Sequence, residues 1–274
     1  MNTIQAPCRS EESAVQQLYI KKHKRHHHFV TIMRFLVLFL FLFIWETAAR
    51  LSLIDSFFFS SPSIVISYFL KMVKDGSFFS NTGITLLETL VSFLLVTVIS
   101  LVVATLLWYS KTLSEILEPY LVILNSLPKS ALAPLFIVWL GTGTDTIIVA
   151  GISVAVFGSV ISLYTSFKHV DEEKLKLIYT LGGNRLTALK KVVLPASVPA
   201  ILSNMKVNIG LALVGVIIGE FLAARRGLGY LIIYGTQVFQ LNMVITSIII
   251  LCIIAMILYQ CIQFAEHYYK KKSS

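Results

Sequence analysis

Charge is scarce in this chain. Of its 274 residues only 14% are Asp, Glu, Lys or Arg, about half of the share in a typical soluble domain. Hydrophobic residues make up 56%, and the mean hydropathy is +0.80. A soluble sphere of this size could not cover so much apolar surface. The composition excludes a disordered protein and a coiled coil, and it indicates a protein dissolved in a lipid bilayer.

Cysteine is also rare. Of the three cysteines, Cys8 lies near the N-terminus, and Cys252 and Cys261 lie in an apolar run. An odd count without a closely spaced pair excludes a disulfide scaffold and a zinc framework. The apolar runs lack a paired Asp-x-x-Asp and a His-Glu-x-x-His. These absences leave no support for a membrane-embedded enzyme, so we expect no catalytic residue and no metal ligand.

Six apolar runs are long enough to cross a bilayer, for which about 20 residues suffice. They predict an all-α, polytopic membrane protein with six transmembrane helices at about 29–49, 84–108, 120–140, 144–164, 200–222 and 244–264. The first run is too long for the apolar part of a signal peptide, and no small-residue cleavage site follows it. We therefore expect it to be retained as a signal anchor.

Lys and Arg indicate the orientation, because cytoplasmic segments of membrane proteins are enriched in them. With the N-terminus inside and six crossings, fifteen basic residues fall on cytoplasmic segments and five on external ones. This count predicts a multi-pass protein of the cell membrane with both termini in the cytoplasm. The external residues are Arg50, Lys71, Lys74, Arg225 and Arg226.

The same reasoning divides the chain into four parts. We predict a basic cytoplasmic tail at 1–28, a first transmembrane helix with an external segment at 29–83, a permease-like core at 84–268 and a cytoplasmic tail at 269–274. The run KKHKRHHH at 21–28 fits attraction to anionic lipid headgroups. Metal binding by its histidines is the weaker interpretation, because no acidic residue or cysteine stands among them. The net charge of +9 does not indicate nucleic-acid binding here.

The cytoplasmic segment at about 168–199 carries the most specific signal. Asp171 can cap a helix, and Glu172 and Glu173 follow in its first turn, where the helix dipole favours acids. Leu175, Ile178 and Leu181 then form one apolar stripe. Gly182–Gly183 ends that helix, and Asn184 can cap a second one from Arg185 to about Val193. Pro195 and Pro199 mark the entry into the fifth span.

This segment resembles the EAA loop of binding-protein-dependent ABC-importer permeases. The family pattern is Glu-Ala-Ala, three residues, Gly, nine residues, Ile, one residue, Leu-Pro. With the glycine at Gly182, Val192 takes the Ile position and Leu194–Pro195 the Leu-Pro position without a gap. The Glu-Ala-Ala itself is replaced by Lys176, Leu177 and Ile178. The missing acid removes a salt bridge that the family's glutamate makes with the ATPase.

Other segments are similar to the nitrate, sulfonate and taurine branch of that family. They are IWETAAR at 44–50, SSPSIVISYFLKMVKDG at 60–76, LVILNSLPKSALAPLFIVWLGTG at 121–143 and GEFLAARRGLGYLI at 219–232. The resemblance implies a homodimer of this permease, two copies of a cytoplasmic ATP-binding subunit and an extracytoplasmic substrate-binding protein. It also implies that ATP and Mg bind to the partner ATPase and that this chain binds no cofactor.

The sequence independently supports the expectation that another subunit binds ATP. No G-x-x-x-x-G-K-[ST] occurs, and GTGTD at 141–145 lacks the lysine of a phosphate-binding loop. The turn of the EAA-like loop is then the expected contact with the ATPase. The residues predicted to couple are Thr180, Leu181, Gly182, Gly183, Asn184, Arg185, Leu194 and Pro195.

Polar residues inside the spans predict either structural ion pairs or a substrate pathway. Three carboxylates, Glu46, Glu88 and Glu220, have Arg50, Lys129, Arg225 and Arg226 as candidate partners. Pro128 and Pro134 are expected to interrupt the third span, and broken helices in transporters often line cavities. The tentative pathway residues are Asn125, Ser126, Lys129, Ser130, Glu88 and Glu220.

Alternatives from other classes explain less. A secondary transporter would need internal repeats, which the two halves do not show. A bare membrane anchor leaves the Gly-to-Leu-Pro spacing unexplained. The resemblance implies a substrate pathway for a small solute such as a sulfonate, taurine, nitrate or a similar anion. A thiamine-precursor pyrimidine is the alternative cargo, because the branch also includes carriers of such molecules.

Overall fold

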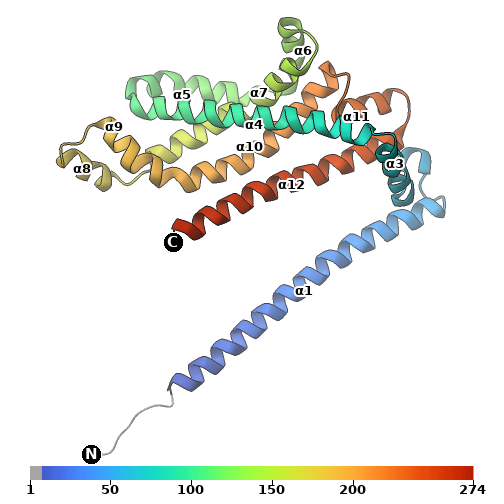
Figure 1. Ribbon diagram of the computed structural model, residues 1–274, viewed down its shortest axis with the longest axis horizontal. Coiled ribbons are helices and arrows are strands. Elements are labelled where there is room, and N and C mark those ends of the chain that lie inside the picture. Colours follow the sequence, from blue (N-terminus) through green and yellow to red (C-terminus); the bar gives the residue numbers. More distant parts are fainter. Residues whose placement is uncertain (1–7, 274) are drawn as a thin grey trace, which may run out of the picture. The chain divides into compact units, whose positions relative to one another are not determined.

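The structure, a computed structural model, describes residues 8–273, with side chains from Phe29 to Tyr268 and at Tyr19 and His26 (Figure 1). Every regular element in this range is a helix, and the chain divides into two compact units, Met1–Ile64 and Val65–Ser274. Most side chains of the basic tail, and those of Lys270–Lys272, lie outside the described residues. The all-α prediction is confirmed.

The first unit consists of α1 (Cys8–Arg50), α2 (Ser56–Phe59) and the first turn of α3 (Pro62–Lys74). The carboxylate of Glu46 accepts from Arg50 Nε at 2.7 Å, from the Ser63 amide at 3.1 Å and from its hydroxyl at 3.0 Å. These bonds join the end of α1 to the start of α3. The predicted pairing of Glu46 with Arg50 is therefore confirmed.

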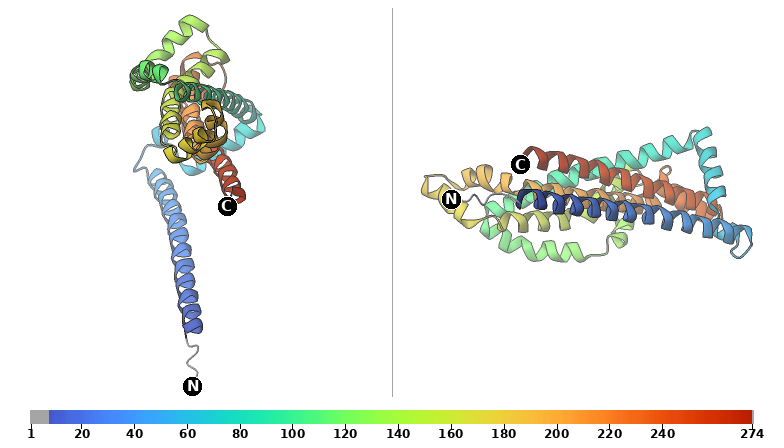
Figure 2. Two further views of the ribbon diagram at one scale, coloured as in Figure 1. Left: turned by 90° about the vertical axis from the view of Figure 1, so that its left-hand side faces the viewer. Right: turned by 90° about the horizontal axis from the view of Figure 1, so that it is seen from below.

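The second unit is built on four long helices, α4 (Ser77–Tyr109), α7 (Thr144–Lys168), α10 (Leu194–Ala223) and α12 (Leu241–Ser273) (Figure 2). Together with Phe29–Arg50 of α1, the described residues hold five helices long and apolar enough to cross a membrane. The bent pair α5 (Lys111–Ser126) and α6 (Lys129–Leu140) gives a sixth if it counts as one span. Five of the six predicted runs thus become continuous helices.

Small residues bring α7 and α10 into close contact. A Cβ atom built at Gly215 would lie 2.7 Å from the Gly151 Cα and 2.8 Å from the Ala150 carbonyl oxygen. One built at Gly219, on the next turn of the same face, would lie 2.9 Å from the Ile147 Cα. Gly215 and Gly219 form a G-x-x-x-G pair, the spacing that lets helix backbones approach in membranes. The sequence contained this signal, which our sequence analysis did not use.

A bulky residue at Gly215 is expected to separate these helices. Gly215→Leu should abolish recovery of folded protein in detergent, measured by gel filtration, because its Cβ meets backbone atoms that cannot move aside. Gly210→Leu on the same helix is the control, since nothing lies within 4 Å of a Cβ there. Equal recovery of the two variants would contradict the packing assigned to this face.

The third predicted span is not one helix, which corrects the sequence prediction for 120–140. It consists of α5 and α6, which are bent by 97° at the break between them. Pro128 cannot donate a backbone hydrogen bond and forces the preceding residue out of the helical region, so Leu127 is extended with ψ 137°. Pro134 lies inside α6 and does not interrupt it. Only one of the two predicted prolines therefore breaks the span.

The fifth span also differs from its prediction. Arg185–Ala223 is one continuous helical stretch that contains Pro195 and Pro199, so neither proline separates the loop from the span. It runs through α9 (Arg185–Ala188), the π-helix η1 (Leu189–Val193) and α10. A proline ring clashes with the carbonyl four residues earlier, and a π turn widens the helix where such a clash would occur. The clash that Pro195 would otherwise make explains the π turn directly before Leu194–Pro195.

Candidate functional site

A helical hairpin lies at one end of the second unit, formed by α8 (Glu172–Thr180) and α9 (Figures 1 and 2). Its caps are those that the sequence predicts. Asp171 Oδ1 accepts from the Glu173 amide at 2.9 Å, and Asn184 Oδ1 accepts from the Thr187 amide at 2.9 Å. Between the helices, Gly182 has φ +79°, which a side chain would strain.

Two backbone bonds close the turn between the helices. The Gly183 amide donates to the Ile178 carbonyl at 2.9 Å and the Gly182 amide donates to the Tyr179 carbonyl at 3.0 Å. This is the Schellman pattern that ends a helix on a left-handed glycine. A Cβ at Gly183 would lie 2.6 Å from a methyl carbon of Ile178. Both glycines are therefore required by the turn, which gives the hairpin one defined shape.

The tip of the hairpin is apolar and exposed. Leu181 is 75% exposed, and Leu177 and Tyr179 are 58% and 46% exposed. Of the predicted apolar stripe, Leu175 and Ile178 are half-buried, whereas Leu181 is exposed. Of the residues predicted to couple, Thr180, Leu181, Gly182, Asn184, Arg185 and Pro195 are exposed, whereas Gly183 and Leu194 are half-buried.

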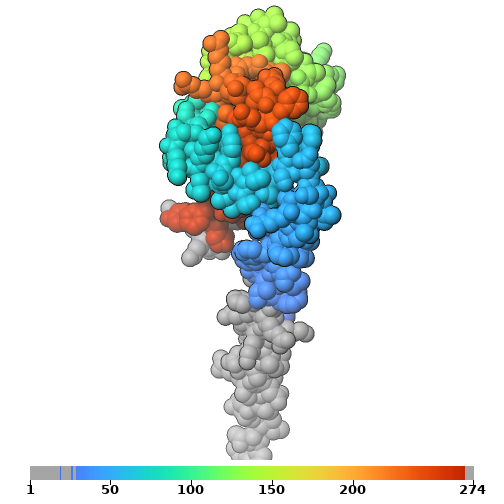
Figure 3. All heavy atoms as spheres, turned by 90° about the vertical axis from the view of Figure 1, so that its right-hand side faces the viewer, coloured from blue at the N-terminus to red at the C-terminus, as the bar shows by residue number. Residues whose placement is uncertain are grey.

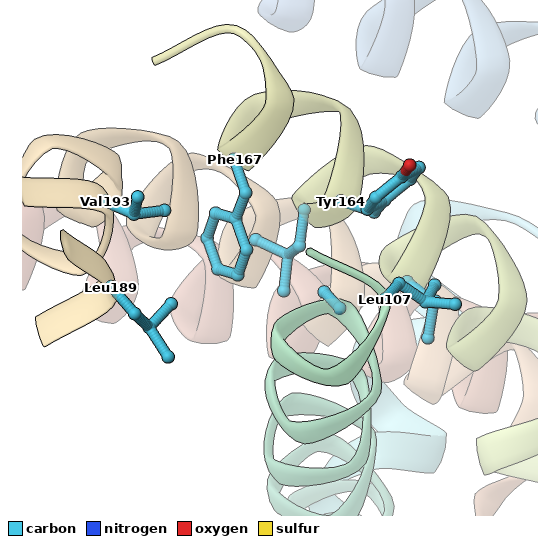
Figure 4. Close-up of a cluster of buried hydrophobic side chains, with 8 residues drawn as sticks. Leu107, Tyr164, Phe167, Leu189 and Val193 are labelled. Atoms are coloured by element: carbon cyan, nitrogen blue, oxygen red, sulfur yellow. The ribbon is translucent and has the colours of Figure 1, made fainter. Parts of the chain in front are cut away.

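The base of the hairpin is held by a buried apolar cluster (Figure 4). Leu189 and Val193 of η1 pack with Phe167 of α7 and Leu107 of α4. Phe167 and Val193 are completely buried. Because packed cores deform little, a displacement of the exposed tip would also displace the helices that pack against its base.

Arg185 connects the hairpin to α4, a contact that the sequence analysis missed. Its Nη2 donates to the Trp108 carbonyl at 2.9 Å, and the guanidinium lies 5.5 Å from the Trp108 ring centroid. It also lies 6.0 Å from the Tyr109 ring centroid. A cation at a helix C-terminus is favourable, and here it satisfies one of the last carbonyls of α4. Arg185 therefore fixes the hairpin as well as forming part of its exposed turn.

The corner between α5 and α6 holds the other basic residue of interest, Lys129. Its Nζ donates to the carbonyls of Leu124, Asn125 and Leu127, the last at 3.0 Å. These carbonyls have no helical partner because Pro128 ends α5. Lys129 thus caps α5, and its Nζ also lies 5.6 Å from the Phe157 ring centroid. Asn125, Ser126 and Ser130 are exposed at the same corner.

Glu220 clamps the start of α11 (Leu228–Gln237). Its Oε2 accepts from the Gly229 amide at 2.5 Å and its Oε1 accepts from the Thr85 hydroxyl at 2.6 Å. Thr85 Oγ1 in turn accepts from the Leu228 amide at 2.9 Å, and Asn81 Oδ1 accepts from the Gly227 amide at 2.8 Å. The first amides of α11 are therefore bound by side chains of α4 and α10. Figure 3 looks onto this end, with the start of α4 (teal) beside α11 (orange).

Two glycines make room for this clamp. A Cβ at Gly227, where φ is +120°, or at Gly229 would collide with the Glu220 carboxylate. A carboxylate at a helix N-terminus is stabilised by the exposed amides and the helix dipole. The charge of Glu220 is therefore compensated by α11 and not by the arginine or lysine that the sequence analysis considered.

Glu88 lies beside Glu220 and lines a cavity of about 510 Å³. It is 1% exposed, and its Oε2 has no hydrogen-bond partner among the described residues. Thr144 and the exposed Arg225 and Arg226 line the same cavity. The ion pairs of the described residues do not include Glu88, Arg225 or Arg226. The cavity thus combines one buried acid with two basic side chains at its edge.

The predicted pathway residues form two separate groups. Lys129 contacts Phe157, which is 13 positions along α7 from Thr144 at the Glu88 cavity, or about 20 Å of helix. Pairing of Lys129 with Glu88 or Glu220 is therefore wrong. Glu88 is also 20 positions along α4 from Trp108, which puts about 30 Å between the cavity and the hairpin end. The bent pair α5 and α6 connects these two ends.

Among the described residues no group of three or more His, Cys, Asp or Glu side chains could hold a metal ion. The arrangement can instead bind a charged solute at one end and a protein at the other.

Comparison with known proteins agrees with this arrangement. The family described as "Binding-protein-dependent transport system inner membrane component" matches residues 96–271. A probable ABC transporter permease of Haemophilus influenzae is 31% identical over 85% of this chain and 94% of its own length. A permease of Bacillus subtilis named for aliphatic sulfonates, SsuC, is 27% identical over 77% of this chain and 76% of its own.

Relatives with other names match as well. The taurine permease TauC of Escherichia coli is 26% identical over 78% of this chain and 80% of its own length. The formylaminopyrimidine permease ThiX of Halalkalibacterium halodurans is 25% identical over 68% and 74%. Among solved structures, a chain of a bacterial ABC transporter for alginate import matches with a TM-score of 0.65 at 14% identity, covering 92% of this chain and 99% of that one. This last likeness shows the fold.

Proposed function

Because the chain belongs to the family of binding-protein-dependent transport system inner membrane components, we propose that it forms the substrate pathway of an ATP-driven importer of small organic anions. It is a multi-pass membrane permease of the ABC importer type and a transport component. Aliphatic sulfonates, including taurine, are the cargo class that we favour, because the chain is similar to SsuC and TauC. A thiamine-precursor pyrimidine is the second candidate, favoured by the similarity to ThiX.

The α8–α9 hairpin is the proposed contact with the ATPase. The observation that supports it is the exposed apolar tip, with Leu181 at 75% exposed, on a base buried between α4 and α7. An exposed apolar tip fits a groove of a partner protein, in which its side chains lose their contact with water. Closing of the partner would then move the rigid helices and open the pathway alternately to each side.

The remaining partners follow from the same proposal. Two copies of this chain form the pore, two ATP-binding subunits bind ATP and Mg beneath it, and an external binding protein delivers the solute. This chain itself binds no cofactor. ATP hydrolysis belongs to the partner, since the sequence lacks a phosphate-binding loop with lysine.

Uptake of a labelled sulfonate tests this function. Cells that lack the chain should fail to accumulate taurine or another alkanesulfonate, and the intact chain should restore uptake and copurify with an ATPase. Restored uptake of a pyrimidine alone would favour the second candidate. Uptake that continues after ATP depletion, without a copurifying ATPase, would contradict the importer itself.

The proposed orientation has its own test. In a variant without the three native cysteines, Asp75→Cys should be labelled from outside by a membrane-impermeant maleimide, and Lys176→Cys only after the membrane is opened. Both side chains are exposed, so labelling reports the side and not burial. Labelling of both from the same side would mean that α4 to α7 cross the membrane differently, with the bent pair not counting as a span.

A further inference from the structure

Glu88 is a buried acid with one carboxyl oxygen that has no hydrogen-bond partner in the described part of the chain. Its Oε2 has no hydrogen bond among the described residues, and no described lysine or arginine lies within ion-pair distance. Its hydrogen bonds with Glu220 and Thr144 supply no positive charge. A buried acid is stabilised by a cation or a hydrogen-bond donor on its free oxygen. A cationic group that enters the cavity can therefore bind at this oxygen.

Two residues of the opposite charge line the same cavity. They are Arg225 and Arg226, and Thr142 and Thr144 also line it. The volume of about 510 Å³ lies within the range of roughly 300–1,000 Å³ typical of small-molecule sites. A metal ion fits poorly, because Glu88 is the only carboxylate among the described lining residues and the two arginines repel a cation. A molecule with both charges fits this lining.

We propose that this cavity binds a small zwitterion, with its cationic nitrogen against Glu88 and its anionic group against Arg225 and Arg226. The proposal rests on the proposed importer function and makes the cargo more specific, since it requires a cationic nitrogen in addition to the anionic group. Glu88 then discriminates a zwitterion from a simple anion of the same size. Binding at this end would place the solute about 30 Å from the hairpin.

Three probes of nearly equal size separate the two charges. Taurine carries an ammonium and a sulfonate, isethionate replaces the ammonium by a hydroxyl, and ethanolamine replaces the sulfonate by a hydroxyl. Their binding is measured by calorimetry on the permease purified with its ATPase subunits, without the external binding protein. The wild-type complex should bind taurine more tightly than either single-charge probe.

The variants assign each charge. Glu88→Gln should weaken taurine and ethanolamine by about ten- to a hundredfold, as expected for a lost hydrogen bond to a charged group, and leave isethionate unchanged. Arg225→Gln with Arg226→Gln should weaken taurine and isethionate and leave ethanolamine unchanged. Glu115→Gln is the control, since Glu115 is exposed and pairs only with Lys111 at 3.7 Å. Gel filtration of each complex verifies that it is intact.

Several results would overturn the proposal. They are equal binding of taurine and isethionate by the wild type, no binding of taurine at millimolar concentration, or an unchanged taurine affinity in Glu88→Gln. Failure of the importer function has a different signature, because it appears as loss of ATP-driven uptake and of the copurifying ATPase. A complex could bind taurine with the predicted dependence on Glu88 and still not transport it. That result would contradict the importer role only.

Discussion

Replacing Glu220 by alanine is expected to destabilise the protein more than any other single change of a polar residue discussed above. The variant loses two hydrogen bonds to a buried charge and leaves the Gly229 amide and the Thr85 hydroxyl without that partner. At about 1.5–3 kcal/mol for each bond, the expected loss is about 3–6 kcal/mol. Thermal unfolding in detergent, followed by gel filtration, measures it.

The conservative variant separates the clamp from a general effect of size. Glu220→Gln keeps one acceptor oxygen but presents an amide group to the other donor, so an intermediate loss is expected. Glu115→Ala, at an exposed carboxylate, should unfold at the wild-type temperature. If Glu220→Ala did the same, α11 would not depend on this clamp.

An aspartate at Leu181 is expected to uncouple the permease from its ATPase. Leu181 is 75% exposed at the hairpin tip, so the substitution costs little in folding, whereas a buried charge in the proposed interface is costly. We expect at least about a tenfold loss of ATPase that copurifies with the chain, since one unpaired interface charge costs more than 1.4 kcal/mol. The same variant should lose ATP-driven uptake.

Two further variants distinguish shape from charge at this tip. Leu181→Met keeps the apolar contact and should retain the ATPase, while Lys174→Asp adds a negative charge to an exposed position earlier on α8 and should have a smaller effect. Full retention of ATPase by Leu181→Asp would mean that the hairpin docks through other residues or not at all.

The hairpin shows how much local sequence can predict. Asp171 and Asn184 cap the helices as expected, and Gly182 takes the left-handed conformation that ends α8. Each of these features depends on bonds between residues at most five positions apart, so the sequence contains all of their determinants. Leu181, the last member of the predicted apolar stripe, lies directly after α8 and is exposed.

Contacts between distant residues could not be predicted in the same way. Thr85 and Glu220 are 135 positions apart, and Arg185 and the Trp108 carbonyl are 77 positions apart. The sequence offered Lys129 or an arginine as partners for the buried acids, because charge type alone suggests them. The ion pair between Lys206 of α10 and Glu266 of α12 also joins residues far apart in the sequence.

Sequence alone determined the bilayer as solvent, the positions of the apolar helices and the capped hairpin, because composition, run length and local capping are properties of single segments. Tertiary structure decided the break after Leu127, the capping roles of Lys129 and Glu220, and the position of Glu88 at a cavity. These depend on which helix faces which. Close packing of α7 against α10 at their glycines contributes to that arrangement. The arrangement of the helices then determines whether a polar side chain lies next to an amide, a carbonyl or a cavity.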